Sequence, residues 1–423
     1  MDEAWIAICI FALTYILIIS ERVSKTTAAM MGAVMMVLLR IMEQHDAFSF
    51  IDFNTIGLLI GMMTIVAITK RTGIFQFMAV KTARAAGGDP WKILVGFSLI
   101  TALASALLDN VTTVLLMVPI TLVVTDTLEV NPKPFLISEI IMANIGGTAT
   151  LIGDPPNIMI GSATRFGFLD FIINLTPVVI IIMAVVLLVL RFIFKKDLKY
   201  NPESQEKIRK MDEQKILDDK KLLVRSLVVL GITLVSFLLH KTLGLESATV
   251  ALFGAGLLLL WSGVDPEEVM DDIEWATIFF FAGLFVIVGG LEVTGVIDKL
   301  AVAVINFTRG NMVLMAIGVL WVSAIASTVI DNIPFVATMI PLIHSFGELG
   351  VSHDLAPIWW ALALGACLGG NGSLVGASAN VVVAGVAERH NEPISFVEYL
   401  KYGLPIMGLT IVISMAYLYL RYL

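Results

Sequence analysis

The sequence has little charge and little cysteine, and each shortage argues against a class of protein. Asp, Glu, Lys and Arg make up 15% of the 423 residues, whereas soluble domains have about 25%. The two cysteines, Cys9 and Cys367, can form neither a disulfide framework nor a Cys-only metal site. The five histidines are scattered without metal-ligand spacing. The net charge of −8, with no basic tail, argues against nucleic acid as a partner.

Several catalytic motifs are also absent. The sequence contains no G-x-x-x-x-G-K-[ST] loop for ATP and no H-E-x-x-H metalloprotease motif. The segment Gly376–Asn380 resembles a serine-hydrolase elbow, but it ends in Asn where that motif has Gly. The sequence therefore predicts no enzyme, no metal site and no cofactor.

Long apolar runs take the place of charge. Hydrophobic residues account for 58% of the chain, and four runs are long enough, or nearly so, to span about 30 Å of hydrocarbon. These runs are Ala4–Ser20, Pro177–Phe194, Ser247–Trp261 and Pro405–Leu420. They do not alternate apolar and polar residues as the strands of a barrel would. The acidic flank of the first run favours a membrane helix over a cleavable signal. We therefore expect an all-α polytopic membrane protein.

An unusual pattern occurs twice. The stretch Ser105–Ile120 reads SALLDNVTTVLLMVPI, and Ser327–Leu342 reads STVIDNIPFVATMIPL. Each places an Asp-Asn pair inside an apolar run, with a Pro ten residues after the Asp, at an offset of 222 residues. Intramembrane acids are costly and are usually functional, and a pair in two repeats is typical of a transporter site. The alternative is that each Asp only caps the helix after it.

The repeat predicts the domain organisation. We expect two inverted repeats of five transmembrane helices, each with a re-entrant hairpin and a broken helix. The predicted ranges are a first repeat at 1–194, with its hairpin at 91–125 and its broken helix at 134–163; a cytoplasmic linker at 195–221; and a second repeat at 222–423, with its hairpin at 312–346 and its broken helix at 357–386.

The broken helices are predicted from paired glycines. Asn144–Asn157 reads NIGGTATLIGDPPN, and Cys367–Asn380 reads CLGGNGSLVGASAN. Adjacent glycines followed by small polar residues weaken a helix and free backbone groups to face a cavity. Close helix packing is the alternative explanation of the glycines. Asp154 precedes two prolines, so it is either a helix cap or a coupling acid without a partner in the second repeat.

Lys and Arg placement predicts the orientation. With the linker in the cytoplasm, 21 of the 27 Lys and Arg residues fall inside, and both termini face out. The 21 inside residues include Arg22 and Lys25, which this orientation places in a cytoplasmic loop. The expected location is the cytoplasmic (inner) membrane.

These motifs identify the chain as similar to the ion transporter superfamily, in the branch of arsenite permeases, D-type sodium/proton antiporters and the melanosomal P protein. The resemblance rests on LLDNVTT at Leu107–Thr113, the glycine-rich Asn144–Asn157, and IDNIPF at Ile330–Phe335. It implies a scaffold domain and a transport domain that holds both hairpins and both unwound helices. Pro334 and Phe335 replace Thr112 and Thr113 in the second hairpin, so the two half-sites are expected to differ chemically.

The predicted site combines the hairpin tips with the helix breaks. The expected substrate- or ion-binding residues are Asp109, Asn110, Thr112, Thr113, Asn144, Gly147, Thr148, Thr150, Asp331, Asn332, Asn371 and Ser373. Burial favours the protonated form of a carboxyl, so Asp109, Asp331 and Asp154 are the expected proton-coupling residues. Thr176 lies outside these motifs, and its replacement by Ala is expected to be nearly silent.

The predicted function is proton-coupled efflux of arsenite or antimonite. Acids at both tips repel an anion, whereas a neutral trihydroxide is not repelled. A sodium/proton antiporter is the alternative. A channel and an intramembrane aspartyl protease are less favoured alternatives, and the protease motif G-x-G-D lacks its first Gly, because Leu151 stands there. The expected partners are the lipid bilayer, protons and a small inorganic solute, which is arsenite, antimonite or Na⁺. An ATPase subunit or a homodimer is left open.

Overall fold

The structure, a computed structural model, describes residues 3–20, 22–198, 208, 217, 219–352 and 354–423. Every regular element among these residues is a helix. Nine of the described helices are long and apolar enough to cross a membrane. The prediction of an all-helical membrane protein is therefore confirmed. Most of the predicted linker at 195–221 lies outside the described residues.

The order of the helices in the first half of the chain recurs in the second half. The first half contains α1 (Glu3–Ser20), α2 (Lys25–Leu38), α3 (Gln44–Ser49), α4 (Phe53–Lys70), α5 (Ile74–Ala85), α6 (Pro90–Leu107), α7 (Asn110–Leu128), α8 (Lys133–Gly147), α9 (Pro155–Ala163) and α10 (Phe168–Phe194). The second half contains α12 (Lys220–Leu243), α13 (Ser247–Ser262), α14 (Pro266–Asp271), α15 (Trp275–Val293), α16 (Val296–Thr308), α17 (Met312–Val329), α18 (Asn332–Glu348), α19 (Ala356–Gly369), the short 3-10 helix η2 (Gly370–Gly372), α20 (Ser378–Arg389) and α21 (Phe396–Tyr422). The inversion of one repeat relative to the other, and the domain boundaries, stay predictions.

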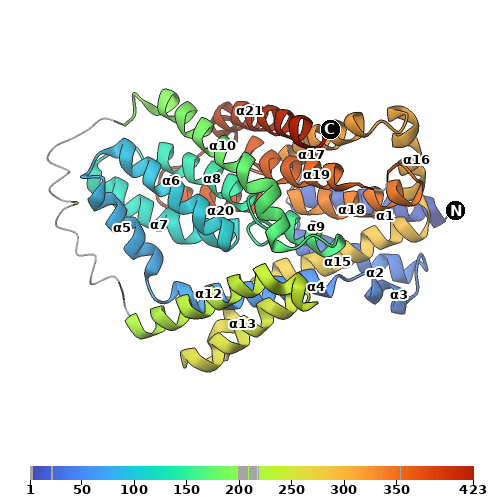
Figure 1. The fold of residues 1–423 in the computed structure, drawn as a ribbon, viewed down its shortest axis with the longest axis horizontal. Helices are drawn as coiled ribbons and strands as arrows, with labels where there is room; N and C mark the ends of the chain where they lie inside the picture. The colour runs from blue at the N-terminus through green and yellow to red at the C-terminus, as the bar shows by residue number, and fades with distance from the viewer. Residues whose placement is uncertain (1–2, 21, 199–207, 209–216, 218, 353) are drawn as a thin grey trace.

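Two groups of helices build the molecule, and each takes members from both halves. In the first, which we call the scaffold group, α4 packs on α13, α2 packs on α15, and α1 and α12 lie against these pairs. In the second, the hairpin group of α6–α9 and α17–α20, α6 packs on α8, α17 on α19, α7 on α20 and α18 on α9. Figure 1 shows α12, α13, α4 and α2 in the lower part of the view and α6, α8, α17 and α19 above them.

The paired helices α6–α7 and α17–α18 approach from opposite ends of the molecule. In Figure 1, α6 and α7 lie to the left and α17 and α18 to the right, with their connections near the centre. Each connection ends one helix and caps the next. The Asp109 carboxylate accepts from the Thr112 N–H at 2.8 Å, and the Asp331 carboxylate accepts from the Ile333 N–H at 3.2 Å. Such caps satisfy N–H groups that no helical carbonyl can reach.

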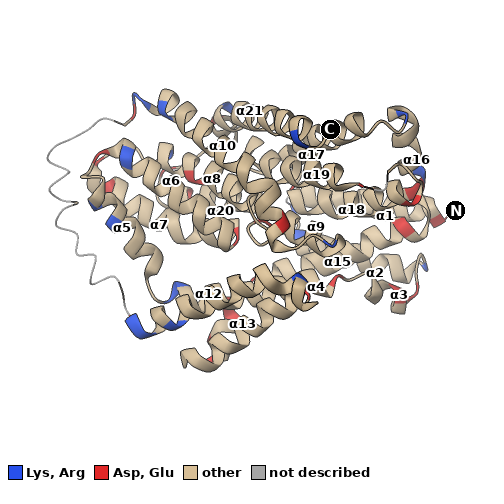
Figure 2. Cartoon of the chain, in the orientation of Figure 1, with Lys and Arg blue, Asp and Glu red and all other residues tan. Residues whose placement is uncertain are grey.

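Charge is confined to the helix ends and to a few central positions. Figure 2 shows the long helices largely free of charge along their lengths, with Lys and Arg near the left-hand ends of α5, α6 and α12. The N-terminus is marked at the opposite end of the view. Figure 2 also shows Lys or Arg near α16 at that end, and the orientation of the chain in the membrane stays a prediction.

Small residues let the two broken helices approach the hairpins closely. A Cβ atom built on Gly146 would lie 2.1 Å from the carbonyl oxygen of Ala102 in α6, and one built on Gly369 would lie 2.6 Å from that of Ala324 in α17. Both contacts are with backbone, which cannot rotate away as a side chain can. Close packing, which the sequence left as an alternative, is therefore a real function of these two glycines.

We expect Gly146→Ala to destabilise the protein. The added methyl must push α6 and α8 apart, and overpacking of this kind costs about 1–3 kcal/mol. The apparent melting temperature of the detergent-solubilised protein, followed by size-exclusion fluorescence, checks this. Gly231→Ala in α12 is the matched control, because a Cβ there meets no atom within 4 Å. Equal melting temperatures for the two variants would contradict the packing argument.

Candidate functional site

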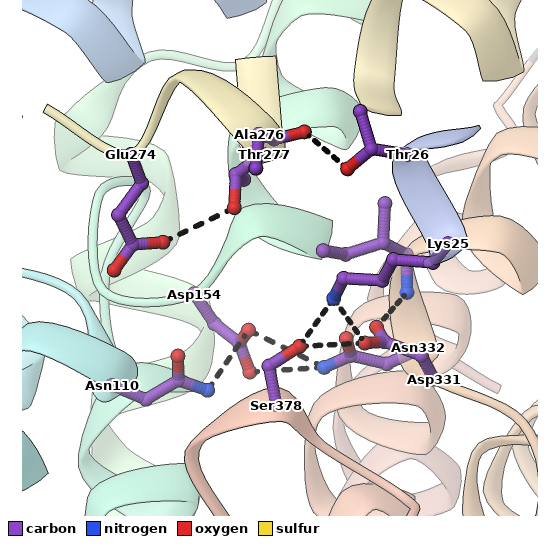
Figure 3. A network of polar contacts seen from close by, with 11 residues as sticks. Lys25, Thr26, Asn110, Asp154, Glu274, Ala276, Thr277, Asp331, Asn332 and Ser378 are labelled. Atoms are coloured by element: carbon purple, nitrogen blue, oxygen red, sulfur yellow. Dashed lines mark hydrogen bonds and ion pairs between the residues drawn. The ribbon is translucent and has the colours of Figure 1, made fainter. Parts of the chain in front are cut away.

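The two hairpin tips meet at a single buried carboxylate, that of Asp154. The side-chain amide of Asn110, from the first tip, donates to Asp154 Oδ1 at 3.4 Å. The amide of Asn332, from the second tip, donates to Oδ1 at 3.3 Å and to Oδ2 at 3.4 Å. Asp154 itself is fully buried. Figure 3 shows the three side chains converging from α7, α18 and the residue before α9. Groups that lie more than 170 residues apart in the sequence are thus joined through one acid.

The sequence allowed two roles for Asp154, a helix cap and a coupling acid. Asp154 precedes Pro155 at the first turn of α9, where a capping side chain is expected. Its carboxylate makes no capping hydrogen bond to that helix. The carboxylate instead faces the hairpin tips and lines a cavity of about 570 Å³. The structure thus shows no cap by this side chain, and its coupling role stays a prediction. The counterpart of Asp154 in the second repeat is Ala377.

The central cavity lies between the scaffold group and the hairpin group. Asp109, Asn110 and Asn332 line it from the hairpin group, and Glu274, at the start of α15, lines it from the scaffold group. Glu274 Oε2 accepts from the Thr277 hydroxyl at 3.1 Å. No described side chain forms an ion pair with Asp109, Asp154 or Glu274. Lys25 also lines this cavity, but its ammonium pairs with Asp331. The cavity therefore holds three acidic side chains without an ion-pair partner among the described residues.

The second acid of the repeat, Asp331, has a different environment. The ammonium of Lys25, at the start of α2, lies 3.0 Å from Asp331 Oδ2 and donates to the hydroxyl of Ser378 at 2.6 Å. The same hydroxyl donates to Asp331 Oδ2 at 2.7 Å. Figure 3 shows this triangle beside the Asn332 amide. The charge count from the sequence placed Lys25 in a cytoplasmic loop, whereas the structure places it in the site.

A cluster of amides supports the site from behind. Asn144, in α8, donates to the side-chain oxygens of Asn371 and Asn380 at 3.0 Å each, and its own oxygen accepts from Asn110 at 3.3 Å. All four side chains are buried. Asn144 and Asn371 were predicted to bind substrate, but in this structure they bind other amides and do not line the central cavity.

One asparagine in each repeat satisfies the backbone of the broken helix. The Asn157 amide lies 2.8 Å from the carbonyl oxygen of Thr150, 3.1 Å from that of Thr148 and 3.4 Å from that of Gly147. In the second repeat the Asn380 amide lies 2.7 Å from the carbonyl oxygen of Gly370 and 2.9 Å from that of Ser373. Irregular backbone at membrane depth must find such partners within the protein.

The small polar residues of the breaks also serve the backbone. The Thr150 hydroxyl donates to the Ala106 carbonyl and the Ser373 hydroxyl to the Thr328 carbonyl, each at 2.5 Å. The Thr148 hydroxyl donates to the Asn144 carbonyl at 2.7 Å. The hydroxyl groups of these predicted binding residues therefore tie each break to a hairpin or to its own helix.

The remaining predicted residues occupy three different places. The Thr113 hydroxyl is buried without a described partner, and Gly147 packs against the Gly153 carbonyl. Thr112 lines a second cavity. Thr176, expected to tolerate Ala, donates to the Ala149 carbonyl in the first break at 3.0 Å. The expectation that Thr176→Ala is nearly silent stays a prediction.

The second cavity adjoins the first. It measures about 310 Å³, and Glu274 and Met63 line both cavities. At its edge Lys70 and Arg71 pair with Asp272 at 2.6 and 3.2 Å. Burial disfavours the charged form of Asp272, but the hydrogen bonds and charges of Lys70 and Arg71 outweigh this effect and hold its pKa below the usual value. Asp272 therefore stays charged at neutral pH and fixes the loop before Glu274.

Three site residues were missed from the sequence: Lys25, Glu274 and Ser378. Glu274 could have been found, because the offset of 222 residues aligns it with Asp52, and both residues begin equivalent helices. The repeat aligns Ser378 with Pro155 and Lys25 with Ser247. Neither counterpart is a predicted site residue, so the repeat gives no reason to place Ser378 or Lys25 in the site. Their partners lie 47 and 306 residues away along the chain.

Comparisons with known proteins agree with this architecture. The family profile described as "Citrate transporter", CitMHS, matches residues 15–365. An uncharacterized transporter of Mycobacterium tuberculosis is 43% identical over 99% of this chain and 98% of its own length. The human P protein is 33% identical over 98% of this chain and 60% of its own length.

A solved structure has a similar fold. The YdaH transporter of Alcanivorax borkumensis superposes with a TM-score of 0.59 at 13% identity, over 99% of this chain and 98% of its own. At this identity the likeness concerns the fold alone.

We expect Asn157→Ala to destabilise the first break. The substitution leaves buried carbonyl oxygens without a donor, which costs about 1–3 kcal/mol. Asn157→Asp should also lower the melting temperature, because it keeps the volume but removes the amide hydrogens. Asn306→Ala, at an exposed position in α16, is the control. Unchanged melting of both Asn157 variants would show that the break does not depend on this side chain.

Proposed function

The chain belongs to the citrate transporter family CitMHS, and we propose that it is a proton-coupled secondary transporter that exchanges a small cation for protons through the central cavity. The observation that carries this proposal is the charge of the cavity. Three acids, Asp109, Asp154 and Glu274, line it together with one base, Lys25, which is already paired with Asp331. A partly desolvated cavity with surplus carboxylates attracts cations and repels anions.

The same carboxylates supply the coupling. A proton and a metal cation such as Na⁺ both bind to carboxylate oxygens, so they compete for Asp154 and Asp109. Asp154 is the centre of this competition because the amides of Asn110 and Asn332 hold it from both tips. Loading the acid with a proton removes the charge that those amides stabilise, which links occupancy to the arrangement of the two hairpins.

Arsenite or antimonite efflux is the second candidate. A neutral trihydroxide is not repelled by the cavity, and the Asn110 and Asn332 amides that line it can bind hydroxyl groups. The hydroxyl groups of Thr148, Thr150 and Ser373 were also expected to donate to such a solute, but they donate to backbone carbonyls instead. For this reason we place cation exchange first.

Free citrate, which the family description names, is a less favourable cargo on electrostatic grounds. At neutral pH it carries several negative charges, and it would face the carboxylates of Asp109, Asp154 and Glu274 in the cavity. Coulomb repulsion between partly buried like charges is weakly screened.

We propose the cytoplasmic membrane as the location. The distribution of Lys and Arg favours an orientation in which both termini face out and residues 195–221 face the cytoplasm. Cysteine labelling from either side of the membrane, with single cysteines placed at exposed helix ends, distinguishes this orientation from its opposite.

We expect the purified protein in proteoliposomes to dissipate an imposed pH gradient when Na⁺ is added, as reported by a pH-sensitive dye. Asp154→Asn and Asp109→Asn should each lower the exchange rate at least about tenfold, equivalent to about 1.4 kcal/mol, because the amide takes up no proton at neutral pH and has no negative charge to attract the cation. Asp46→Asn, at an exposed position in α3, should leave the rate unchanged.

Parallel assays identify the cargo. Proton-driven arsenite accumulation without a Na⁺ effect would favour the second candidate, and uptake of labelled citrate that depends on the same acids would overturn the charge argument. Full exchange by both Asn variants, in protein that elutes as a single species, would remove Asp109 and Asp154 from the coupling mechanism.

A further inference from the structure

We propose that Lys25 is a tethered cation that fills the second half-site, which is the tip between α17 and α18 with Asp331. Only the first half-site, the tip between α6 and α7 with Asp109, then exchanges a mobile cation or proton. This inference rests on the proposed function. The observation behind it is a difference between two equivalent tips. Asp331 pairs with the Lys25 ammonium at 3.0 Å, whereas Asp109 forms no ion pair with a side chain in the described part of the chain.

The surroundings of the Lys25 ammonium resemble those of a bound cation. Besides the Asp331 carboxylate, it contacts the Ser378 hydroxyl at 2.6 Å and lies 5.1 Å from the centre of the Phe280 ring. A carboxylate and a hydroxyl are ligands that Na⁺ also uses, and an aromatic ring face attracts any cation. The ammonium occupies the position where a mobile ion would bind, and it excludes one both by volume and by charge.

The chain departs from its own symmetry at this point. The repeat register places Ser247 opposite Lys25. Ser247 begins α13 and lies with its hydroxyl 3.5 Å from the side-chain oxygen of Asn54, so no tethered cation serves the first tip. The register also places Asp52 opposite Glu274. Asp52 caps α4 and lines a different cavity, whereas Glu274 adds a negative charge beside Asp109. One half-site is therefore neutralised and the other is left acidic.

The polar and charged groups around Lys25 come from both helix groups. Asp331 and Ser378 belong to the hairpin group, Glu274 and Phe280 belong to the scaffold group, and Asp154 lines the same cavity. Only Asp331 lies within ion-pair distance of Lys25 among the described residues. The lysine therefore compensates one acid fully and leaves Asp109, Asp154 and Glu274 for the mobile ion.

The test counts cations. Equilibrium binding of radioactive Na⁺ to the detergent-purified protein should give one ion per chain in the wild type and two in Lys25→Ala, because the second half-site is then vacant. The Hill coefficient for Na⁺ in the exchange assay should rise from near one toward two. Lys25→Arg keeps a tethered cation and should behave as the wild type. An ion pair that serves folding alone would change the melting temperature and leave the count at one.

A double variant tests the same point if Lys25→Ala folds poorly. Asp331→Asn alone leaves the ammonium without its counter-charge, and exchange should fall at least about tenfold. The double variant Lys25→Ala/Asp331→Asn restores neutrality and should recover most of the exchange, with one ion bound. If the double variant stays inactive, Asp331 is itself an obligatory carrier of the mobile ion, and the inference is wrong.

Failure of the proposed function gives a different result. A wild type that neither binds nor exchanges Na⁺ would remove cation exchange as the activity. In that case, gain of Na⁺ binding in Lys25→Ala, abolished by adding Asp331→Asn, would still support the tethered cation. No binding in either protein would overturn it.

Discussion

A carboxylate buried at membrane depth must receive hydrogen bonds from the protein, and in this chain the donors of Asp154 come from two separate hairpin tips. Asn110 and Asn332 each contribute an amide, and Asn144 connects the first of these to the second broken helix through Asn371 and Asn380. The hairpins, the breaks and the cavity all depend on this convergence. Without it, one acid would be left unsatisfied and the two halves would share few polar contacts at the centre.

The two repeats are most informative where they differ. Asp154 aligns with Ala377, Lys25 with Ser247, and Thr112 with Pro334. The backbone-supporting residues, in contrast, are matched: Asn157 with Asn380, Thr150 with Ser373 and Gly146 with Gly369. The two halves thus share the parts that hold irregular backbone within the membrane and the tip acids Asp109 and Asp331, whereas Asp154 and Lys25 have no charged counterpart. This division explains how a nearly symmetric framework can hold an asymmetric site.

Much of the framework could be predicted from the sequence, because local chemistry determines it. The Asp-Asn pairs mark the positions where helices end and begin again, and the paired glycines mark the breaks. The partners of polar side chains could not be predicted in the same way. Thr148, Thr150 and Ser373 were expected to face a cavity, but backbone carbonyls of their own helix or a neighbouring hairpin take their hydrogen bonds. Lys25 pairs with Asp331, which lies 306 residues away along the chain, and no local sequence pattern predicts such a contact.

The close contacts of Gly146 with Ala102 and of Gly369 with Ala324 have a mechanical consequence. Where backbone packs directly on backbone, no side chain can rearrange to let the helices slide. We therefore expect each broken helix and its hairpin to move as one rigid body. Relative movement is then expected at the interface between the two helix groups, where the central cavity lies and where Lys25 of the scaffold group pairs with Asp331 of the hairpin group. Any opening of the molecule to one side or the other has to occur along that interface.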